Sequence, residues 1–232
     1  MIYIITQRDP FFIDSFLHTF DKYDIPFVVF DMPNFKQGKK AGIKRAIRLY
    51  GWLGFGRLIT KIAPKIFSSG FRNATEIVKV KKMQDLHDIF SSLNDEDVVL
   101  SLSAPERIPV EIMNSKTLKL NFHCGELPTY AGMMPIFWQV HDGKKDIIIT
   151  LHHMAKDIDE GSIISETKLP VSQTFFKLSQ KAKEVSAHIF AKTIMFRKEI
   201  KTTNIRQNKV VQLRKFPSKS DVAKVKPKIK MI

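Results

Sequence analysis

The chain contains a single cysteine, Cys124, so no disulfide can form within it, and this composition suits a reducing compartment. No apolar run approaches the roughly 20 residues that a transmembrane helix requires. The first residues, MIYIITQRDPFF, contain too short an apolar run for a signal peptide and an early acidic residue. These absences predict a soluble, cytoplasmic protein without a membrane span.

The sequence also lacks the motifs that most often indicate phosphate or metal chemistry. The glycines of GWLGFG, residues 51–56, do not follow a predicted strand and fit neither the dinucleotide fingerprint nor the P-loop, so a bend between helices is the better interpretation. His152 and His153, taken with His123 and Asp159, suggest a metal site, but the spacings typical of strong sites are absent. A metal site is therefore a minority interpretation, and we expect no metal cofactor.

The charge balance is strongly basic. Among 232 residues, 38 are Lys or Arg and 23 are Asp or Glu, which gives a net charge of +15. This surplus favours an anionic partner: nucleic acid, a phosphorylated metabolite or an acidic membrane surface. No signature of a nucleic-acid-binding module is present, so nucleic acid is not the favoured partner.

Strands and helices are predicted to alternate through most of the chain. Strands are predicted at residues 2–6, 26–30, 76–80, 97–102, 118–123 and 147–154, with a further extended piece at 162–171. Helices are predicted from Asp9-Pro10 through Phe20, as one or two short amphipathic helices within 35–67, and at 83–93, 108–113, 132–141 and 175–200.

This alternation predicts an α/β fold with an open, mostly parallel twisted sheet and flanking helices. Residues 1–200 are the expected catalytic domain. Residues 201–232 are basic, lack a long periodic helix and are expected to form a short C-terminal arm, with a short strand at 210–213.

Three polar side chains form the candidate site. Asn121 and His123 lie two apart in a predicted strand, so they share a face, and ligands of open α/β sheets bind at the carboxyl ends of the strands. Asp159 follows the next strand and is expected at the same edge of the sheet. An amide can stabilise an oxyanion, while an imidazole and a carboxylate can move protons. Each residue alone fits an ordinary hydrogen-bonding role, and the order of the set favours a site.

These residues resemble a known signature. Asn121-Phe122-His123, then Leu127-Pro128, Gly132 and Pro135, and finally Asp159 with Gly161 are similar to the pattern of the formyltransferase family that uses N10-formyltetrahydrofolate. The resemblance is strongest over residues 97–195. It implies a formyltransferase-like, Rossmann-type domain that takes N10-formyltetrahydrofolate as co-substrate.

The resemblance also implies a role for each residue. Asn121 and His123 would hold the oxyanion of the tetrahedral intermediate, and His123 or Asp159 would take the proton lost by the attacking amine. The implied folate-binding residues are Ser103, Glu106, Arg107, Ile108, Ala155, Asp157 and Ile158. The implied substrate-binding residues are Gln7, Arg8, Tyr130, Gly132 and Met134.

Two positions depart from the family pattern. Gly125 stands where the family often has Ser, and Ala131 stands where it often has Arg just before the loop glycine. The first departure affects the loop geometry, and the second removes a cation that would contact an anionic substrate. Neither touches the catalytic trio.

A comparison with individual members of this family reduces the number of candidate substrates. Methionyl-tRNA formyltransferase carries an additional C-terminal domain, and glycinamide ribonucleotide formyltransferase has a glycine-rich loop after its first strand; neither feature is visible here. The segments TQRDPFF, YGWLGFGRL and RKFPSKSD look more like sugar N-formyltransferases. The resemblance thus implies transfer to the amine of a nucleotide-linked amino sugar, with dTDP as the expected nucleotide, for surface polysaccharide such as the O-antigen of lipopolysaccharide.

Two alternatives stay open: a methionyl-tRNA formyltransferase-like enzyme, and an inactive basic protein that binds nucleic acid or a membrane surface. A homodimer is a further expectation, because the apolar Val210, Val211 and Leu213 could pair with another chain.

Overall fold

A seven-stranded sheet forms the centre of the computed structural model, which describes residues 1–232 except 8, 10–11, 34–37, 63–73, 173 and 201–211. The strand order is β3-β2-β1-β4-β5-β6-β7. The strands are β1 (Ile2–Thr6), β2 (Phe27–Asp31), β3 (Ala74–Lys79), β4 (Val98–Leu102), β5 (Leu118–His123), β6 (Asp146–His153) and β7 (Ile163–Pro170). Strands β1 to β5 run parallel to one another, and β6 is antiparallel to both β5 and β7. The predicted open, mostly parallel sheet is confirmed.

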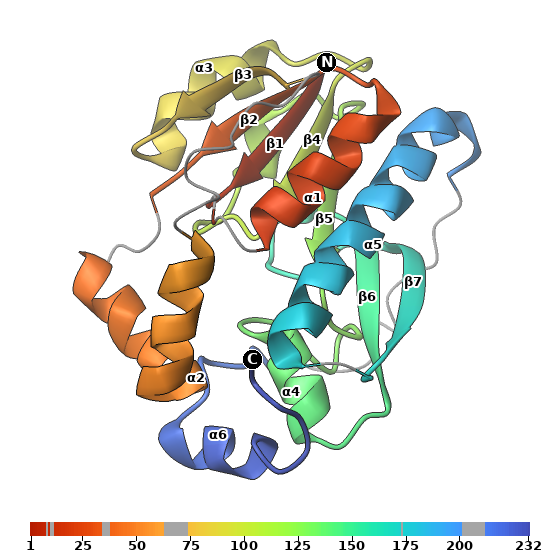
Figure 1. Ribbon diagram of the computed structural model, residues 1–232. Coiled ribbons are helices and arrows are strands. Elements are labelled where there is room, and N and C mark those ends of the chain that lie inside the picture. The colour runs from red at the N-terminus through yellow and green to blue at the C-terminus, as the bar shows by residue number, and fades with distance from the viewer. Residues whose placement is uncertain (8, 10–11, 34–37, 63–73, 173, 201–211) are drawn as a thin grey trace.

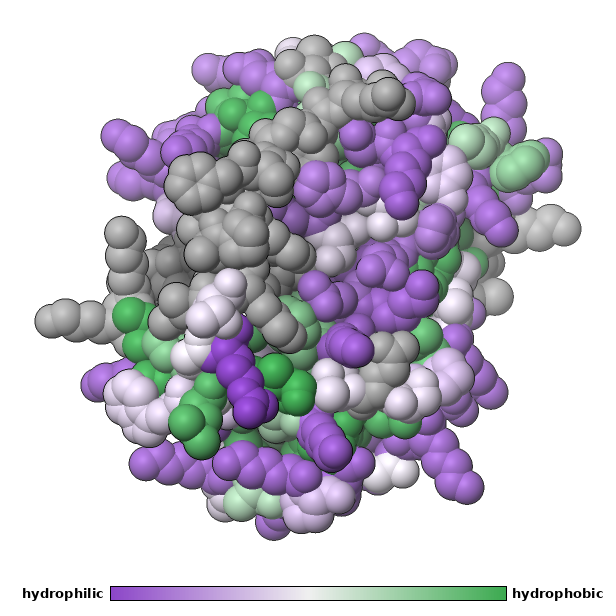
Figure 2. Space-filling model, viewed as in Figure 1, coloured by the Kyte–Doolittle hydropathy of each residue, from purple (hydrophilic) through white to green (hydrophobic). Residues whose placement is uncertain are grey.

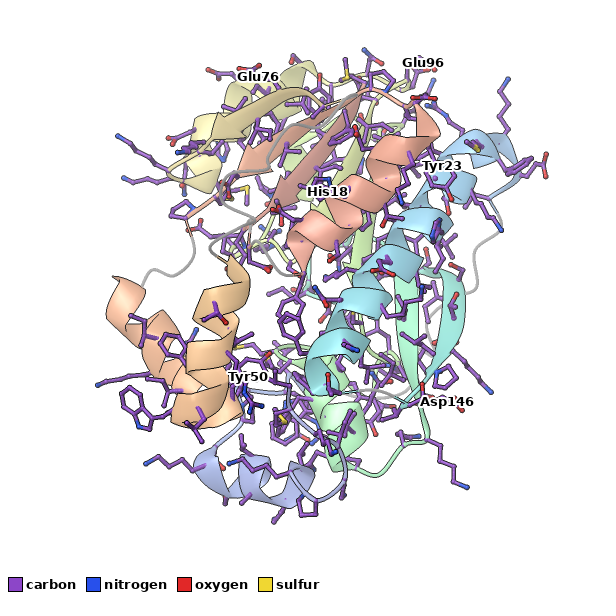
Figure 3. The ribbon with its side chains drawn as sticks, in the orientation of Figure 1. His18, Tyr23, Tyr50, Glu76, Glu96 and Asp146 are labelled. Atoms are coloured by element: carbon purple, nitrogen blue, oxygen red, sulfur yellow. The ribbon has the colours of Figure 1, made fainter. Side chains whose placement is uncertain are left out.

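Helices cover both faces of this sheet (Figure 1). The α-helices are α1 (Ile13–Phe20), α2 (Gly38–Ile62), α3 (His87–Ser92), α4 (Pro135–His141), α5 (Phe175–Met195) and α6 (Lys219–Val225). Short 3₁₀ turns lie at η1 (Asp21–Tyr23), η2 (Met83–Leu86), η3 (Val110–Ile112) and η4 (Arg197–Glu199). Helices α1 and α5 lie side by side on one face. Tyr23 of η1, labelled in Figure 3, has its hydroxyl 2.5 Å from Nδ1 of His188 in α5. Helices α2, α4 and α6 gather beyond the edge where β1 and β2 end.

The alternation of side chains along the strands produces two separate cores. Ile4 of β1 belongs to the core under α1 and α5, whereas the next residue, Ile5, packs into the core under α3. Phe16 of α1 occupies the centre of the larger core, with its ring 6.2 Å from that of Phe122 and 6.1 Å from that of Phe190. Phe122 therefore ties the strand that carries Asn121 and His123 to the two covering helices.

The start of α1 differs from the prediction. The helix begins at Ile13 rather than at Asp9-Pro10, although the Asp9 carboxylate still accepts a hydrogen bond from the Phe12 N–H at 2.6 Å. Asp9 thus supplies an orphan amide of the first turn with an acceptor, as an N-cap does.

Helix α2 bears out the prediction of one or two helices within 35–67. It is two helical pieces joined at Gly51, whose φ of 73° lies in the left-handed region that favours glycine. Just after this kink, Trp52 and Leu53 are 75% and 87% exposed. Figure 2 shows hydrophobic side chains at the surface over α2, whereas hydrophilic side chains cover most of α1 and α5.

The described part of the C-terminal segment packs onto the domain. The unpredicted helix α6 begins with a capping box, in which the Ser218 Oγ accepts from Asp221 N at 3.2 Å and Asp221 Oδ2 accepts from Ser218 N at 2.9 Å. Val222 and Val225 are buried in the larger core. Of the strand predicted at 210–213, residues 210 and 211 lie outside the described residues, whereas Gln212 and Leu213 are not in a strand, and Leu213 is 48% exposed.

In the part of the chain that the structure describes, none of the helices combines the length and apolarity needed to cross a bilayer.

Candidate active site

The pairing of β5 with β6 gathers four polar side chains on one face of the sheet. Asn121 lies opposite His152, and His123 lies opposite Thr150. Residues two apart in a strand share a face, and directly opposed residues of antiparallel strands share it too. All four side chains therefore lie together, and His123, Thr150 and His152 are buried.

Asp159 joins this group by a route that the sequence interpretation described wrongly. Because β6 is antiparallel to β5, its carboxyl end does not lie at the edge where β5 ends. Instead, the segment between β6 and β7 brings Asp159 back over Asn121 and His123. Asp159 Oδ1 is 3.4 Å from Asn121 Nδ2, and Asp159 Oδ2 is 3.4 Å from His123 Nδ1.

The local backbone explains why an aspartate and a glycine stand two residues apart in this segment. Asp159 has a φ of 61°, in the left-handed region that Asp tolerates better than most residues. A Cβ atom at Gly161 would overlap the carbonyl oxygen of His153, so only glycine allows this approach. Asp159 Oδ2 also accepts a 2.9 Å hydrogen bond from the Gly132 N–H, which fixes the carboxylate over the site.

Hydrogen bonding determines the tautomer of His123. Its Nε2 lies 2.7 Å from the carbonyl oxygen of Tyr130, which can only accept, so Nε2 carries a hydrogen. The other ring nitrogen, Nδ1, faces the Asp159 carboxylate. His123 and Asp159 are each 7% exposed. The two side chains thus form a buried pair with one proton position, Nδ1, between them.

His152 was absent from the predicted catalytic set, although it contacts that set directly. Its Nδ1 donates to the His153 carbonyl oxygen at 2.7 Å, and its Nε2 lies 2.9 Å from Asn121 Nδ2. Burial lowers the pKa of His152 to about 4, against a smaller opposing effect of Asp159. The neutral ring therefore accepts a hydrogen bond from Asn121 and fixes the orientation of its amide. The cross-strand register, which the sequence does not give, is the signal that identifies this residue.

The two segments predicted to line the folate pocket lie next to each other. Arg107 Nε donates to the carbonyl oxygen of Lys156 at 2.6 Å, which joins residues 103–108 to residues 155–158. Arg107 is also paired with Glu111. In these segments Ile108 is buried, Glu106 and Ala155 are half-buried, and Asp157 and Ile158 are exposed. Both segments therefore have exposed side chains and main-chain groups next to the Arg107–Lys156 contact, where a folate could bind.

A buried cation reaches the first of these segments from α5. Lys183 is only 8% exposed, and its Nζ donates to Ser103 Oγ at 3.0 Å. Ser103 is exposed and has a φ of 58° directly after β4. The sequence interpretation placed Ser103 in the site but missed Lys183, which lies 80 residues away along the chain.

The predicted substrate-binding residues occupy two places. Tyr130, Gly132 and Met134 belong to the loop between β5 and α4, where Tyr130 contacts His123 and Gly132 contacts Asp159 through main-chain atoms. Gln7 directly follows β1. Arg8 lies outside the described residues.

The glycine at position 125 is tightly enclosed. A Cβ there would lie 2.7 Å from the Pro135 Cβ and 2.9 Å from His123 Nε2. A serine at this position would therefore require the His123 ring or Pro135 to move, so the expectation that this departure does not touch the catalytic trio is wrong.

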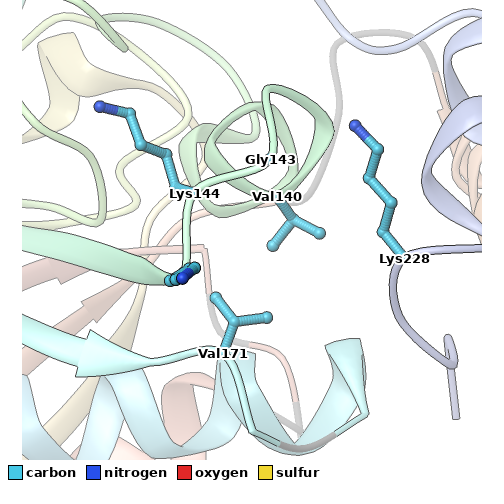
Figure 4. A pocket seen from close by; sticks show the side chains of 6 residues that line it. Val140, Gly143, Lys144, Val171 and Lys228 are labelled. Atoms are coloured by element: carbon cyan, nitrogen blue, oxygen red, sulfur yellow. The ribbon is translucent and has the colours of Figure 1, made fainter.

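A cavity of about 290 Å³ lies apart from these residues (Figure 4). Its lining residues are Val140, Gly143, Lys144, Lys145, Val171 and Lys228. None of them belongs to the predicted site. Among the described residues, no group of three or more His, Cys, Asp or Glu side chains is arranged to hold a metal ion.

The family assignment rests on a match to the formyl transferase family over residues 75–194, slightly more than half of the chain. The chain belongs to the formyl transferase family. The matched region runs from β3 to the end of α5, so it contains Asn121, His123, His152 and Asp159.

Curated relatives of this formyl transferase are similar over part of their length. The methionyl-tRNA formyltransferase of Lysinibacillus sphaericus is 26% identical over 141 residues, which are 57% of this chain and 44% of that protein. The methionyl-tRNA formyltransferase of Streptococcus equi is 30% identical over 96 residues, 41% of this chain and 30% of that protein. The chain thus spans less than half the length of these relatives.

Solved structures show the same fold. A 4-N formyltransferase from Francisella tularensis has a TM-score of 0.59 at 16% identity, covering 97% of this chain and 85% of that one. The sugar 3N-formyl transferase WlaRD, solved with dTDP and 5-N-formyl-THF, has a TM-score of 0.57 at 20% identity, covering 90% and 67%. At these identities the likeness establishes the formyl transferase fold.

Proposed function

We propose that this formyl transferase moves the formyl group of N10-formyltetrahydrofolate to the amine of a nucleotide-linked, dTDP-linked amino sugar. The observation that carries the proposal is the convergence of an amide, an imidazole and a carboxylate: Asp159 lies 3.4 Å from both Asn121 Nδ2 and His123 Nδ1. The reaction would take place in the cytoplasm, and its product would serve surface polysaccharide such as O-antigen.

The geometry supports a division of labour among the trio. The folate supplies the formyl group when bound. As the amine attacks the formyl carbon and the carbonyl electrons move to oxygen, Asn121 Nδ2 is the nearby group that donates to that oxygen, joined by His123 Nδ1 when the proton of the His123–Asp159 pair lies on this nitrogen. Asp159 then accepts the proton lost by the amine, directly or through one water. When the carbon–N10 bond breaks, N10 regains a proton through the His123–Asp159 pair, so the protons balance.

The amide of Asn121 has one hydrogen available for this work. One N–H points to His152 Nε2 at 2.9 Å, and the other has the longer 3.4 Å contact with Asp159 Oδ1. The longer contact is the weaker bond. We therefore assign the second hydrogen to the oxyanion, while the first keeps the amide oriented.

Two observations support a nucleotide sugar as the acceptor. The chain has 38 basic and 23 acidic residues, and this excess of positive charge suits both a nucleotide diphosphate and a polyanionic folate. The fold neighbours include sugar N-formyltransferases, one of them solved with dTDP-3-aminofucose and folinic acid.

A second acceptor has its own support. The curated relatives named above are methionyl-tRNA formyltransferases, and a net charge of +15 suits tRNA as well. We rank it second because the sequence segments that differ among family members look more like the sugar enzymes.

One assay separates these functions. The protein is incubated with N10-formyltetrahydrofolate and either a panel of dTDP- and UDP-linked amino sugars or charged initiator tRNA, and the formylated product is detected by mass. Formylation of a nucleotide sugar that is lost in His123→Ala is the expected result. Transfer to tRNA alone would overturn the first proposal, and no transfer to either would favour an inactive binding protein.

A further inference from the structure

A segment from outside the matched family region pairs with the active-site loop. Arg214 N donates to the carbonyl oxygen of Ala131, and Met133 N donates to the carbonyl oxygen of Arg214, both at 2.8 Å. These bonds form a parallel β-bridge between Gly132 and Arg214. The family match ends at residue 194, so this contact comes from the C-terminal segment of this chain.

The contact is close enough to determine the residue type at position 132. Gly132 has a φ of 93°, and a Cβ there would lie 2.7 Å from the carbonyl oxygen of Arg214 and 2.8 Å from its nitrogen. Glycine is therefore required both by the backbone conformation and by the neighbouring strand. The main chain of Arg214 thus occupies the space that a side chain at position 132 would need.

The same loop holds both members of the buried pair. The Tyr130 carbonyl oxygen accepts from His123 Nε2 at 2.7 Å, and the Gly132 N–H donates to Asp159 Oδ2 at 2.9 Å. The 3.4 Å separation between His123 Nδ1 and Asp159 Oδ2 thus depends on where the loop lies.

Side chains anchor the segment to α4. The Arg214 guanidinium lies 5.2 Å from the centre of the Trp138 ring and 5.6 Å from that of Tyr130. It is also 3.2 Å from the Asp142 carboxylate. Trp138 Nε1 donates to the carbonyl oxygen of Lys215 at 3.1 Å. The segment is thus attached on one side to the loop and on the other to a helix of the domain.

We propose that residues 212–216 are a positioning clamp of the active site, in which the main chain of Arg214 holds loop 131–133 so that Gly132 presents its N–H to Asp159. The clamp itself is independent of the reaction. Its effect on turnover rests on the proposed formyl transfer. Arg214 is a positioning residue, because it acts on the carboxylate through Gly132.

A matched set of variants tests the clamp in the full chain. Arg214→Pro removes the N–H that bonds to Ala131. Lys215→Pro places the same residue one position later, where the described residues show no hydrogen bond from the amide nitrogen. Hydrogen exchange of the Gly132 and Met133 amides is read by NMR, and we expect it to be at least about tenfold faster in Arg214→Pro than in Lys215→Pro. Equal exchange in the two variants would overturn the clamp.

Turnover then tests whether the clamp acts through Asp159. Arg214→Pro is expected to lower kcat at least about tenfold, with the KM of the folate within about twofold. In an Asp159→Asn background the same substitution is expected to have little further effect, because coupled residues are non-additive. Additive losses would show that Arg214 acts by another route. If the wild-type protein transfers no formyl group, the proposed function fails while the exchange result still decides the clamp.

A second pair of variants covers the case in which Arg214→Pro does not fold. Arg214→Gly keeps both main-chain bonds but removes the anchoring side chain and loosens the backbone. The Gly132 and Met133 amides are then expected to exchange about threefold faster than in Lys215→Gly. No difference between these two glycine variants would likewise overturn the proposal.

Discussion

Asn121 Nδ2 lies 2.9 Å from His152 Nε2, and this hydrogen bond joins β5 to β6 next to Asp159. A ring nitrogen can accept here only while His152 is neutral, because an imidazolium has two donors and no acceptor. The orientation of the Asn121 amide therefore depends on the protonation state of its neighbour.

Acidification should destabilise the protein through His152. Burial lowers the pKa of His152 from 6.5 to about 4, and the charged or titratable groups that face it are Asp159, His123 and His153. Between these two pH values the unfolded chain binds a proton that the folded chain does not, so stability falls as the pH drops from 6.5 toward 4. This group contributes up to about 3 kcal/mol of that loss.

Urea unfolding at pH 7, 5.5 and 4 measures this dependence. His152→Gln, which cannot titrate, should show a shallower loss of unfolding free energy than the wild type. His87→Gln removes an exposed histidine instead and should keep the wild-type slope. An unchanged slope in His152→Gln would contradict the neutral state assigned to this ring.

Asp159 should be essential for turnover but not for folding. Asp159→Asn removes the proposed proton acceptor while leaving an oxygen that can still accept from Gly132, so kcat should fall at least about 100-fold. Glu160→Gln removes an exposed carboxylate one residue later and should keep kcat within about twofold of the wild type. Steady-state assays with circular dichroism as the folding check make the comparison. Similar kcat values for the two variants would exclude Asp159 as the proton acceptor.

The sequence placed Asn121 and His123 together because residues two apart in a strand share a face. Asp159 lies beyond α4 and β6, and the expectation that it follows a strand ending at the same edge of the sheet required β6 to run parallel to β5. The direction of β6 was not predictable, since the four residues between α4 and β6 permit either orientation, and the reason given for the position of Asp159 was therefore wrong. His152 was missed for the same reason, because its place beside Asn121 follows only from antiparallel register.

Contacts between segments far apart in the sequence were also not predicted. Nothing local to Lys183 indicates that its amine reaches Ser103, and nothing local to Arg214 indicates that its backbone pairs with Gly132. Helix α6 differs from these cases. Its start, Ser218-Lys219-Ser220-Asp221, carries the capping pattern in the sequence itself, so it was available to be predicted.

Gly161 should tolerate no larger residue. In Gly161→Ala the new Cβ would overlap the carbonyl oxygen of His153, the same atom that accepts from His152 Nδ1. The turn must then open, and we expect a loss of at least about 2 kcal/mol in the free energy of unfolding. Gly56→Ala is the control: its Cβ meets nothing within 4 Å in helix α2, so stability should stay equal or rise by up to about 1 kcal/mol. Comparable unfolding midpoints for the two variants would contradict the close approach.

Lys183 should lower the stability of the free protein and strengthen the binding of an anionic ligand. Its amine is buried, and the hydrogen bond that the structure gives it among the described residues goes to the neutral Ser103 hydroxyl. A buried charge without an opposite charge costs desolvation free energy, which an anionic ligand would offset.

Lys183→Met keeps the length of the side chain and removes the charge. We expect unfolding free energy to stay equal or rise by about 1 kcal/mol. The KM of the folate co-substrate should rise at least about tenfold, with kcat within about threefold, because Ser103, the partner of Lys183, belongs to the segment expected to bind folate. Lys181 lies two residues before Lys183, and its exposed amine is paired with Glu184. Lys181→Met should change neither the free energy of unfolding nor the KM. An unchanged KM of the folate in Lys183→Met, or a rise confined to the KM of the acceptor substrate, would mean that this cation does not bind the folate.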